Sequence, residues 1–235
     1  MNKRLVMKNR VLLIGTGSIA ERHLKNIVKI NKSAEISVYS KSESRARNFV
    51  KKFKENITVL KSLSKKNNFT HIIIASSTNT HNKHLKLLAV ESKNIYCEKP
   101  IPYDKDLKFI NKKIFLKKHN YRVKIGYQLR HNPAIRFIHQ ELKKRENKKL
   151  FLVKFLCGQN LNDWRKNSNY KKLFSAGQKK YGSVYWELSH EIDLINFIIG
   201  KPSLVYSDHK CTNFLKVKVN DISNTILNFK NRPIS

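Results

Sequence analysis

Short apolar runs alternate with amphipathic stretches along the first half of the chain. The four apolar residues 11–14 are too few for a helix and end at a glycine, which predicts a buried strand. Apolar residues then recur at helical spacing, at Ile19, Leu24, Ile27 and Val28. The pattern therefore begins with a strand, a short turn and a helix.

The same alternation continues to about residue 127. Further strands are predicted at residues 35–39, 57–60, 71–75, 94–97 and 122–127, and helices at residues 43–54, around 85–90 and at 104–118. Strands that alternate with helices form a doubly wound parallel sheet, so the fold class predicted for a first domain, residues 1–128, is α/β.

The pattern changes in residues 129–235, which predict a second, α+β domain. A helix is expected from Pro133 to about Glu146, with Ile135, Phe137, Ile138 and Leu142 facing inward. A long strand at residues 150–156 follows, and then one helix from Gly182 to Gly200. The buried stripe of that helix is predicted at Val184, Leu188, Ile192, Ile195 and Ile199. Two strands near residues 204–213 and 221–228 complete the pattern.

The turn after the first strand predicts a dinucleotide site. It has the spacing Gly-x-Gly-x-x-Ala, formed by Gly15, Thr16, Gly17, Ser18, Ile19 and Ala20. Gly15 allows the tight turn, Gly17 lets the backbone approach a pyrophosphate, and the small residue at 20 lets helix and strand pack closely. The helix N-terminus supplies free N–H groups and a favourable dipole for the anion. The alternative is a purely structural strand–helix turn.

Two further segments at predicted strand ends have polar side chains suited to a cofactor. The second strand ends in Ser40 and Lys41, with Arg45 one helical turn on, where a dinucleotide fold places the acidic residue that binds a ribose. Hydroxyls and cations suit a 2′-phosphate, which favours NADP over NAD, unless Lys41 and Arg45 are ordinary surface residues. The strand at 71–75 opens into a polar loop with the candidate cofactor ligands Ser76, Ser77, Asn79 and His81.

Two places have residues suited to proton transfer. Lys99 lies between Glu98 and Pro100 at the carboxyl end of a predicted strand, where it could hydrogen-bond a substrate hydroxyl and assist its proton loss. Glu187 and His190 are three residues apart on a predicted helix, and a carboxylate beside an imidazole is the usual arrangement of a general base. The alternatives are a surface lysine and a helix with a polar flank.

The net charge of the 235 residues is +33, which normally suggests a nucleic-acid or membrane partner. Here the lysines occur in scattered pairs and no nucleic-acid-binding module accompanies them, so no specific nucleic acid is predicted, and a basic nucleic-acid-binding protein remains an alternative.

No apolar run is long enough to span a bilayer and no signal peptide is evident, which predicts a cytoplasmic protein without a membrane partner. The three cysteines are expected to be reduced, mostly buried thiols rather than metal ligands, and no metal site is predicted.

Four segments occur in an order that resembles the Gfo/Idh/MocA oxidoreductases, the family of glucose–fructose oxidoreductase and inositol dehydrogenase. They are Gly15-Thr-Gly-Ser-Ile-Ala-Glu-Arg-His23, Glu98-Lys-Pro100, Gly126-Tyr-Gln-Leu-Arg-His-Asn-Pro133 and Gly182-Ser-Val-Tyr-Trp-Glu-Leu-Ser-His-Glu-Ile-Asp193. The resemblance implies a Rossmann domain joined to an α+β domain with an open, mainly antiparallel sheet. It also implies hydride transfer between NAD(P) and a hydroxyl or oxo carbon of a sugar, inositol or nucleotide sugar, as in bacterial surface-sugar metabolism.

By position, the resemblance makes Lys99 the catalytic lysine and His190 the acid/base, with Glu187 as the assisting carboxylate. Glu98 and Lys99 also join the cofactor site. The residues that the resemblance places near the substrate are Arg130, Asn132, Asp163, Trp164, Arg165, Tyr170 and Asp193.

The end of the chain departs from the family pattern, because family members usually continue beyond the strand that resembles residues 221–228. The expectation is therefore a truncated family member, which predicts a homo-oligomer through the second sheet if that sheet is complete. The alternative is a catalytically inactive dinucleotide-binding fragment whose open sheet edge favours association.

Overall fold

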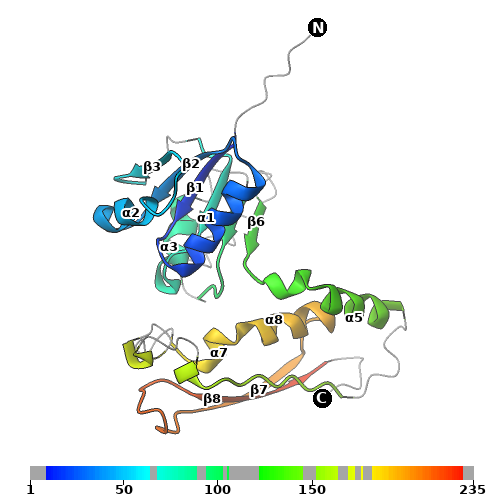
Figure 1. The fold of residues 1–235 in the computed structure, drawn as a ribbon. Helices are drawn as coiled ribbons and strands as arrows, with labels where there is room; N and C mark the ends of the chain where they lie inside the picture. Colours follow the sequence, from blue (N-terminus) through cyan, green and yellow to red (C-terminus); the bar gives the residue numbers. More distant parts are fainter. Residues whose placement is uncertain are drawn as a thin grey trace. The chain divides into compact units, whose positions relative to one another are not determined.

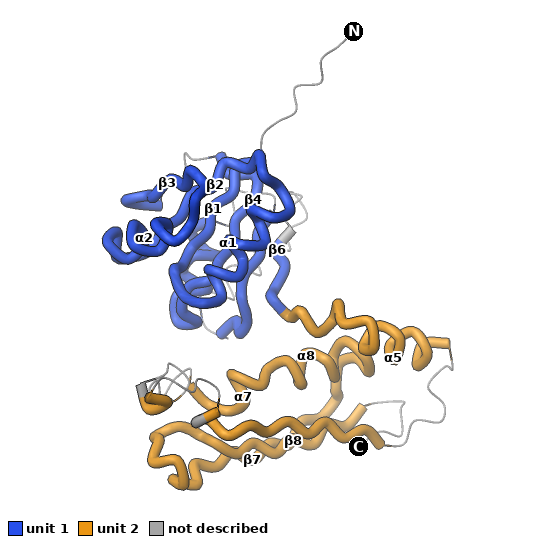
Figure 2. The backbone as a smooth tube through the Cα atoms, viewed as in Figure 1, with its two compact units in different colours: residues 1–126 blue, residues 127–235 orange. Residues whose placement is uncertain are grey.

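The computed structural model describes residues 9–63, 68–88, 94–102, 105, 122–144, 152–163, 169–172, 176 and 182–229. The chain divides into two compact units, residues 1–126 and residues 127–235 (Figure 2). The helix predicted at residues 104–118 lies outside the described residues, apart from Lys105.

Unit 1 is built on a parallel six-stranded sheet (Figure 1). Its strands are β1 (Arg10–Ile14), β2 (Glu35–Tyr39), β3 (Ile57–Leu60), β4 (His71–Ile74), β5 (Asn94–Cys97) and β6 (Arg122–Ile125). The spatial order is β3-β2-β1-β4-β5-β6, so the chain changes direction across the sheet between β1 and β4. In doubly wound sheets, ligands bind outside the carboxyl ends of the strands at this switch point.

Helices cover both faces of this sheet, as the alternating pattern predicts. They are α1 (Ser18–Ile30), α2 (Glu43–Val50) and α3 (His81–Leu88), with a single 3₁₀ turn, η1 (Thr78–Thr80), before α3. Leu13 packs with Leu24 of α1 and Phe49 of α2, whereas its neighbour Leu12 packs with Leu85 of α3. Successive residues of one strand therefore bury opposite faces, and the predicted doubly wound α/β fold is confirmed.

Unit 2 combines helices with a two-stranded antiparallel sheet (Figure 1). Its helices are η2 (Gln128–His131), α5 (Pro133–Lys144), η3 (Leu161–Asp163), η4 (Tyr170–Lys172), α7 (Val184–Glu187) and α8 (Ser189–Ile198), and its strands are β7 (Leu204–Lys210) and β8 (Ile222–Asn228). Tyr185 of α7 stacks on His209 of β7, with 4.6 Å between ring centroids, which identifies the face of the sheet that the helices cover. The predicted α+β character of this part of the chain is confirmed.

Two predicted elements of unit 2 are wrong. Residues 152–160 form no strand, although Val153 and Phe155 still pack against Ile199 and Phe229. The helix expected from Gly182 to Gly200 is broken at Leu188, whose φ of −93° and ψ of 29° separate α7 from α8. Apolar spacing alone could not reveal this break, because a helix interrupted by one residue keeps most of the periodicity.

The predicted inward faces of two helices are also wrong in part. None of the described residues of α5 is buried, and Phe137 is 64% exposed. On α8 the buried residues are Ser189, Asp193 and Leu194, whereas Ile192 of the predicted stripe is 44% exposed. Periodicity identifies the apolar side of a helix but does not show what that side packs against.

The cysteines are free, but only Cys97 is buried, whereas Cys157 and Cys211 are exposed. The expectation of mostly buried thiols is therefore wrong for two of the three.

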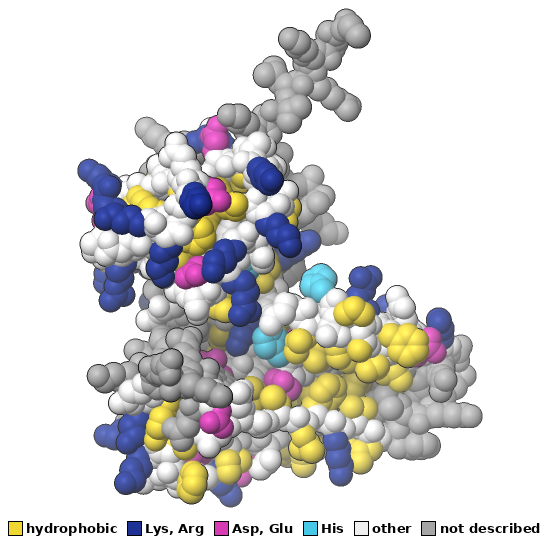
Figure 3. Space-filling model, viewed as in Figure 1, with side chains coloured by type: hydrophobic (Ala, Val, Ile, Leu, Met, Phe, Trp, Pro, Cys, Tyr) yellow, Lys and Arg dark blue, Asp and Glu magenta, His cyan; other side chains and the backbone are white. Residues whose placement is uncertain are grey.

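Among the described residues, no helix is long and apolar enough to cross a membrane. On the face shown in Figure 3, the Lys and Arg side chains of the described residues are spread over both units rather than gathered in one stripe.

Candidate functional site

The turn after β1 has the backbone geometry that requires a glycine at its first position. Gly15 has a φ of 120°, in the left-handed half of conformational space, and its N–H donates to Tyr39 O at 2.9 Å. A Cβ at this position would lie 2.3 Å from Ala75 O, closer than any side chain can approach. Gly15 therefore lets β1 turn into α1 between the ends of β2 and β4.

Gly17, the N-cap residue of α1, has a different environment. Its φ of −83° is open to any residue, and a Cβ there would meet no atom of the described residues within 4 Å. Neither backbone conformation nor internal packing accounts for a glycine here. Close approach of a ligand to the backbone does account for it, and the exposed first turn of α1 presents N–H groups to such a ligand. The residues present thus fit a bound dinucleotide phosphate.

The residues expected near the ribose lie at the carboxyl end of β2. Ser40 is half-buried, and Lys41 and Arg45 are exposed. The nearest carboxylate along the chain, Glu43, accepts a hydrogen bond from Arg47 Nη2 at 2.6 Å. Exposed cations and a paired carboxylate are compatible with an anionic ligand group at this end of the sheet.

The loop after β4 is held by hydrogen bonds within unit 1. Ser76 Oγ is hydrogen-bonded to His84 Nδ1 at 3.0 Å and accepts from Thr80 Oγ1 at 2.9 Å. Ser77 and Asn79 are exposed. Burial lowers the pKa of His84 to about 4, so its ring is neutral near pH 7 and Nδ1 is available as an acceptor.

This histidine gives unit 1 a predicted acid sensitivity. Because the pKa of His84 is about 4 in the folded chain, against an ordinary value of 6.5, its contribution to stability is fully present above pH 6.5 and is lost as the pH falls toward 4. The loss is at most about 3 kcal/mol. In His84→Gln, which keeps an acceptor but does not titrate, the free energy of unfolding should fall less between pH 7 and pH 4.5. The exposed His71→Gln is the control, and an equal fall in both variants would contradict the assignment.

The segment that contains Lys99 is anchored through Glu98. Glu98 Oε1 accepts from His23 Nε2 of α1 at 2.7 Å and from the Tyr96 hydroxyl of β5 at 3.4 Å. Burial, followed by the adjacent Glu98 carboxylate, raises the pKa of Tyr96, so the phenol stays protonated and donates. A Cβ at Gly126 would lie 2.7 Å from Tyr96 Oη and 3.0 Å from Glu98 Oε2, so the absence of a side chain there leaves room for this cluster.

His81 is predicted from the sequence to contact the cofactor, whereas the structure buries its ring. Its ring is 1% exposed, with Nδ1 at 3.0 Å from Pro100 O and Nε2 at 2.9 Å from Ser76 O. Both ring nitrogens therefore face carbonyl oxygens of the chain, and the ring joins the loops that follow β4 and β5. Desolvation lowers the pKa of His81, and these two carbonyl contacts oppose the shift.

In unit 2, Arg130 and Asp193 form a two-point ion pair. Arg130 Nε donates to Asp193 Oδ2 at 2.8 Å and Nη2 donates to Oδ1 at 2.5 Å. The Asp193 side chain is 6% exposed, and the guanidinium lies 5.3 Å from the ring centroid of Phe197. Both residues were predicted to contact substrate. The structure brings them together, and both carboxylate oxygens of Asp193 accept from Arg130.

Breaking this pair should destabilise unit 2. Arg130→Met keeps most of the side-chain length but leaves the Asp193 carboxylate buried without its two donors, at a cost of about 2–3 kcal/mol in the free energy of unfolding. Chemical denaturation of the full chain would measure it, with Arg136→Met on the exposed side of α5 as the control. Equal effects of the two substitutions would show that the pair adds nothing to stability.

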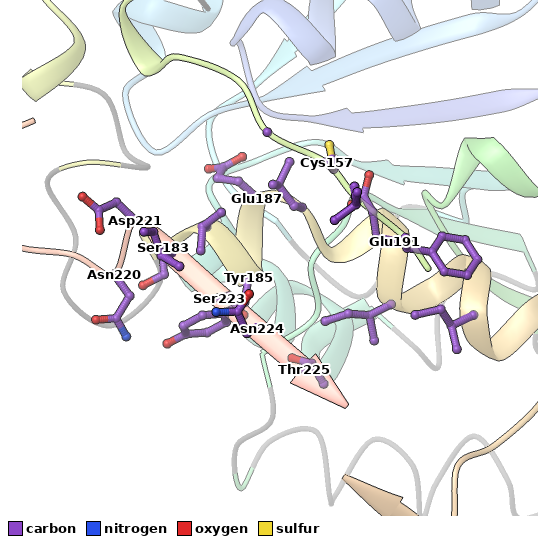
Figure 4. A pocket seen from close by; sticks show the side chains of 18 of the residues that line it. Cys157, Ser183, Tyr185, Glu187, Glu191, Asn220, Asp221, Ser223, Asn224 and Thr225 are labelled. Carbon is purple, nitrogen blue, oxygen red and sulfur yellow. The ribbon is translucent and has the colours of Figure 1, made fainter. Parts of the chain in front are cut away.

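His190 and Glu187 lie on different helices because the chain breaks at Leu188 between them. The His190 ring packs edge-on against Tyr127, with 5.7 Å between centroids. Glu187 lines an apolar hollow of about 870 Å³ formed by residues 152–161, α7, α8, residues 215–221 and β8 (Figure 4). His190 is not among the residues that line this hollow.

Three other predicted substrate contacts take part in local structure. Asn132 Oδ1 accepts from Ala134 N at 2.9 Å and so caps the start of α5. The Tyr170 hydroxyl donates to Leu215 O at 3.0 Å, and Asp163 is exposed at the end of η3. Trp164 and Arg165 lie outside the described residues. Within the described part of the chain, no group of three or more His, Cys, Asp or Glu side chains could hold a metal ion.

Comparison with known proteins finds a family model that matches the first part of the chain. Residues 9–119 match the Gfo/Idh/MocA family, described as an oxidoreductase family with an NAD-binding Rossmann fold. Residues 9–119 are therefore similar to the Rossmann domain of this family. The match spans the glycine turn and the Glu98-Lys-Pro100 segment, on which the resemblance in sequence also depends. A comparison with curated protein sequences finds no significant match.

Solved structures share the fold across both units at low sequence identity. Myo-inositol 2-dehydrogenase from Lactobacillus plantarum has a TM-score of 0.77 and 17% identity, over 97% of this chain and 68% of its own. The WlbA dehydrogenase from Bordetella pertussis, solved with NADH and UDP-GlcNAcA, has a TM-score of 0.76 and 16% identity, over 95% and 68%. A myo-inositol dehydrogenase from Corynebacterium glutamicum has a TM-score of 0.69 and 18% identity, over 97% and 67%. The chain thus spans about two thirds of the length of these proteins.

Reasoning from the sequence missed four residues that the structure places beside the predicted ones. They are His23, Tyr96, Gly126 and Tyr127. Three of them belong to the segments that resemble the Gfo/Idh/MocA family, at the end of the glycine-turn segment and at the start of the Gly126 segment. Their position in those segments was the sequence feature that could have identified these three residues.

Proposed function

We propose that this chain is an NAD(P)-dependent oxidoreductase that transfers hydride between nicotinamide and a hydroxyl or oxo carbon of a sugar, inositol or nucleotide-sugar-like substrate. The observation that supports it most directly is Gly17, whose lack of a side chain is explained by ligand approach and not by the fold. The match of residues 9–119 to an NAD-binding oxidoreductase family supports the reaction class. The neighbours named for inositol, and the one solved with UDP-GlcNAcA, support the substrate class.

In this proposal unit 1 binds the cofactor and unit 2 binds the substrate. The bound nicotinamide supplies or accepts the hydride. His190 takes or returns the proton of a substrate hydroxyl, assisted by Glu187, and Lys99 hydrogen-bonds a substrate hydroxyl. His190 fits this role because its ring is oriented by packing against Tyr127. Lys99 fits because it is half-buried and follows β5 at the carboxyl edge of the sheet.

The proposal favours NADP over NAD. The exposed cations Lys41 and Arg45 follow β2, and Glu43 is already paired with Arg47. A 2′-phosphate would find cations there, whereas the paired Glu43 carboxylate is less available to a free ribose hydroxyl.

A thermal-shift titration of the chain with NADP(H) and NAD(H) tests cofactor binding. A ligand that binds only the folded state raises the melting temperature by mass action, so the cofactor with the larger shift is the preferred one. Lys41→Ala combined with Arg45→Ala should reduce the NADPH shift more than the NADH shift. No shift with either cofactor would refute the proposed function, and a shift without turnover on sugars and inositols would indicate a dinucleotide-binding protein without activity.

We also propose that the chain forms a homo-oligomer through the sheet of unit 2. The register pairs Tyr206 with Ile226, and these side chains are 60% and 58% exposed. Leu204 and Ile222 lie on the same face at 44% and 43% exposure, opposite the face that His209 turns toward Tyr185. Sedimentation of the wild type and of Tyr206→Lys tests this, since a charge at this position should favour the monomer.

A further inference from the structure

We propose that His23 and His81 are positioning residues that hold the backbone on both sides of Lys99 and couple it to the glycine turn. This inference rests on the proposed function, in which Lys99 contacts the substrate. Neither His23 nor His81 was predicted from the sequence to have such a role. His23 comes from α1 and His81 from α3, on opposite faces of the sheet.

The first contact fixes the residue before Lys99. His23 Nε2 and Glu98 Oε1 are 2.7 Å apart, and their side chains are 20% and 17% exposed. The His23 ring also packs edge-on against Tyr96, with 5.1 Å between centroids, so it is held from two directions. A largely desolvated hydrogen bond to a carboxylate is stronger than one in water, and its loss leaves a charge without its donor.

The second contact fixes the residue after Lys99. His81 is buried and contacts Pro100 O and Ser76 O, while the adjacent Asn82 Nδ2 donates to Pro102 O at 2.6 Å. The Glu98 N–H also donates to Ile74 O at 2.8 Å. The backbone from Glu98 to Pro102 is therefore held by two helices and by β4.

The contact through His23 has a further consequence for the glycine turn. His23 lies less than two helical turns after Gly17, on the helix whose N-terminus faces the proposed cofactor site. Cofactor binding at the N-terminus of α1 is therefore linked to Glu98, and through Glu98 to Lys99, by the His23 side chain. Side chains that do not touch the substrate can still fix the position of a reacting group by holding the residues next to it.

Competitive acetylation of the full chain, with peptide mass spectrometry to resolve each lysine, tests this coupling with NADPH and NADH as probes. In the wild type, bound cofactor should lower the labelling rate of Lys99 at least about fivefold. In His23→Ala and in His81→Ala the cofactor should still bind, with a dissociation constant within about threefold of the wild-type value. The cofactor should no longer protect Lys99 in either variant.

Conservative and remote variants separate positioning from general stability. His23→Gln keeps an N–H donor for Glu98 and should restore protection of Lys99. His71→Ala, at the opposite end of the sheet, should behave as the wild type. His81→Gln, which keeps one of the two carbonyl contacts, replaces His81→Ala if the latter does not fold. It should then show partial protection.

The outcomes distinguish this inference from the proposed function. If the wild type binds neither cofactor, the proposed function is refuted and this inference with it. If cofactor binds and still protects Lys99 in both alanine variants, the inference alone is refuted. An equal rise in labelling of all lysines, with no rescue by His23→Gln, would show that these histidines stabilise the fold without positioning Lys99, and would also overturn the inference.

Discussion

Gly15→Ala is expected to destabilise unit 1 by about 3 kcal/mol or more, from a backbone clash and from an unfavourable φ together. The added Cβ would lie 2.3 Å from Ala75 O, and neither atom can move without displacing β1 or β4. The φ of 120° adds strain for any residue with a side chain. Chemical denaturation, followed by far-ultraviolet circular dichroism, would measure the loss.

Gly17→Ala is the matched control, because the same methyl group is added two residues away. No atom of the described residues lies within 4 Å of it and the backbone conformation is unrestricted, so the stability should change by less than about 0.5 kcal/mol. Its affinity for NAD(P)H should nevertheless fall at least about tenfold, because the methyl group occupies the space of the ligand. Equal stability of the two variants would contradict the geometry of the turn, and unchanged cofactor affinity in Gly17→Ala would contradict the cofactor site.

Lys99→Ala and His190→Ala are each expected to lower turnover by about 10²–10⁴-fold, the range for loss of a proton-transfer group. Cofactor affinity should change little, because the proposed phosphate cradle is the separate turn at residues 15–20. Turnover is measured by nicotinamide absorbance on the sugar or inositol that gives the highest rate with the wild type. The thermal shift with NADPH reports binding in parallel.

Matched variants control for the loss of a lysine or a histidine as such. Lys124→Ala changes an exposed lysine of β6, and His131→Ala an exposed histidine of η2. Both should keep wild-type turnover. If Lys99→Ala and His190→Ala also retain full turnover, the catalytic assignment is wrong, even where the cofactor still binds.

The fold of unit 1 could be predicted from the sequence because its signals are local. A strand such as 11–14 shows its burial in its own residues, and the glycine that ends it has a φ that other residues avoid. In unit 2 the signals were weaker. Residues 152–156 alternate between exposed and half-buried but form no strand, and α5 shows an apolar side that no described neighbour buries fully. Strand pairing and helix packing depend on a second segment of the chain, and the residues of the first segment do not identify it.

The sequence by itself determined the alternation of strands and helices, the glycine turn and the order of the four motif segments, since each depends on residues close along the chain. Only the tertiary structure decided which side chains meet. His23 pairs with Glu98 across 75 positions and Arg130 with Asp193 across 63. Such pairs form where the fold brings two buried polar groups within hydrogen-bonding distance, because leaving either one unpaired is costly. Only the tertiary structure showed that the ring nitrogens of His81 face carbonyl oxygens of two loops, and that Asp193 accepts from Arg130.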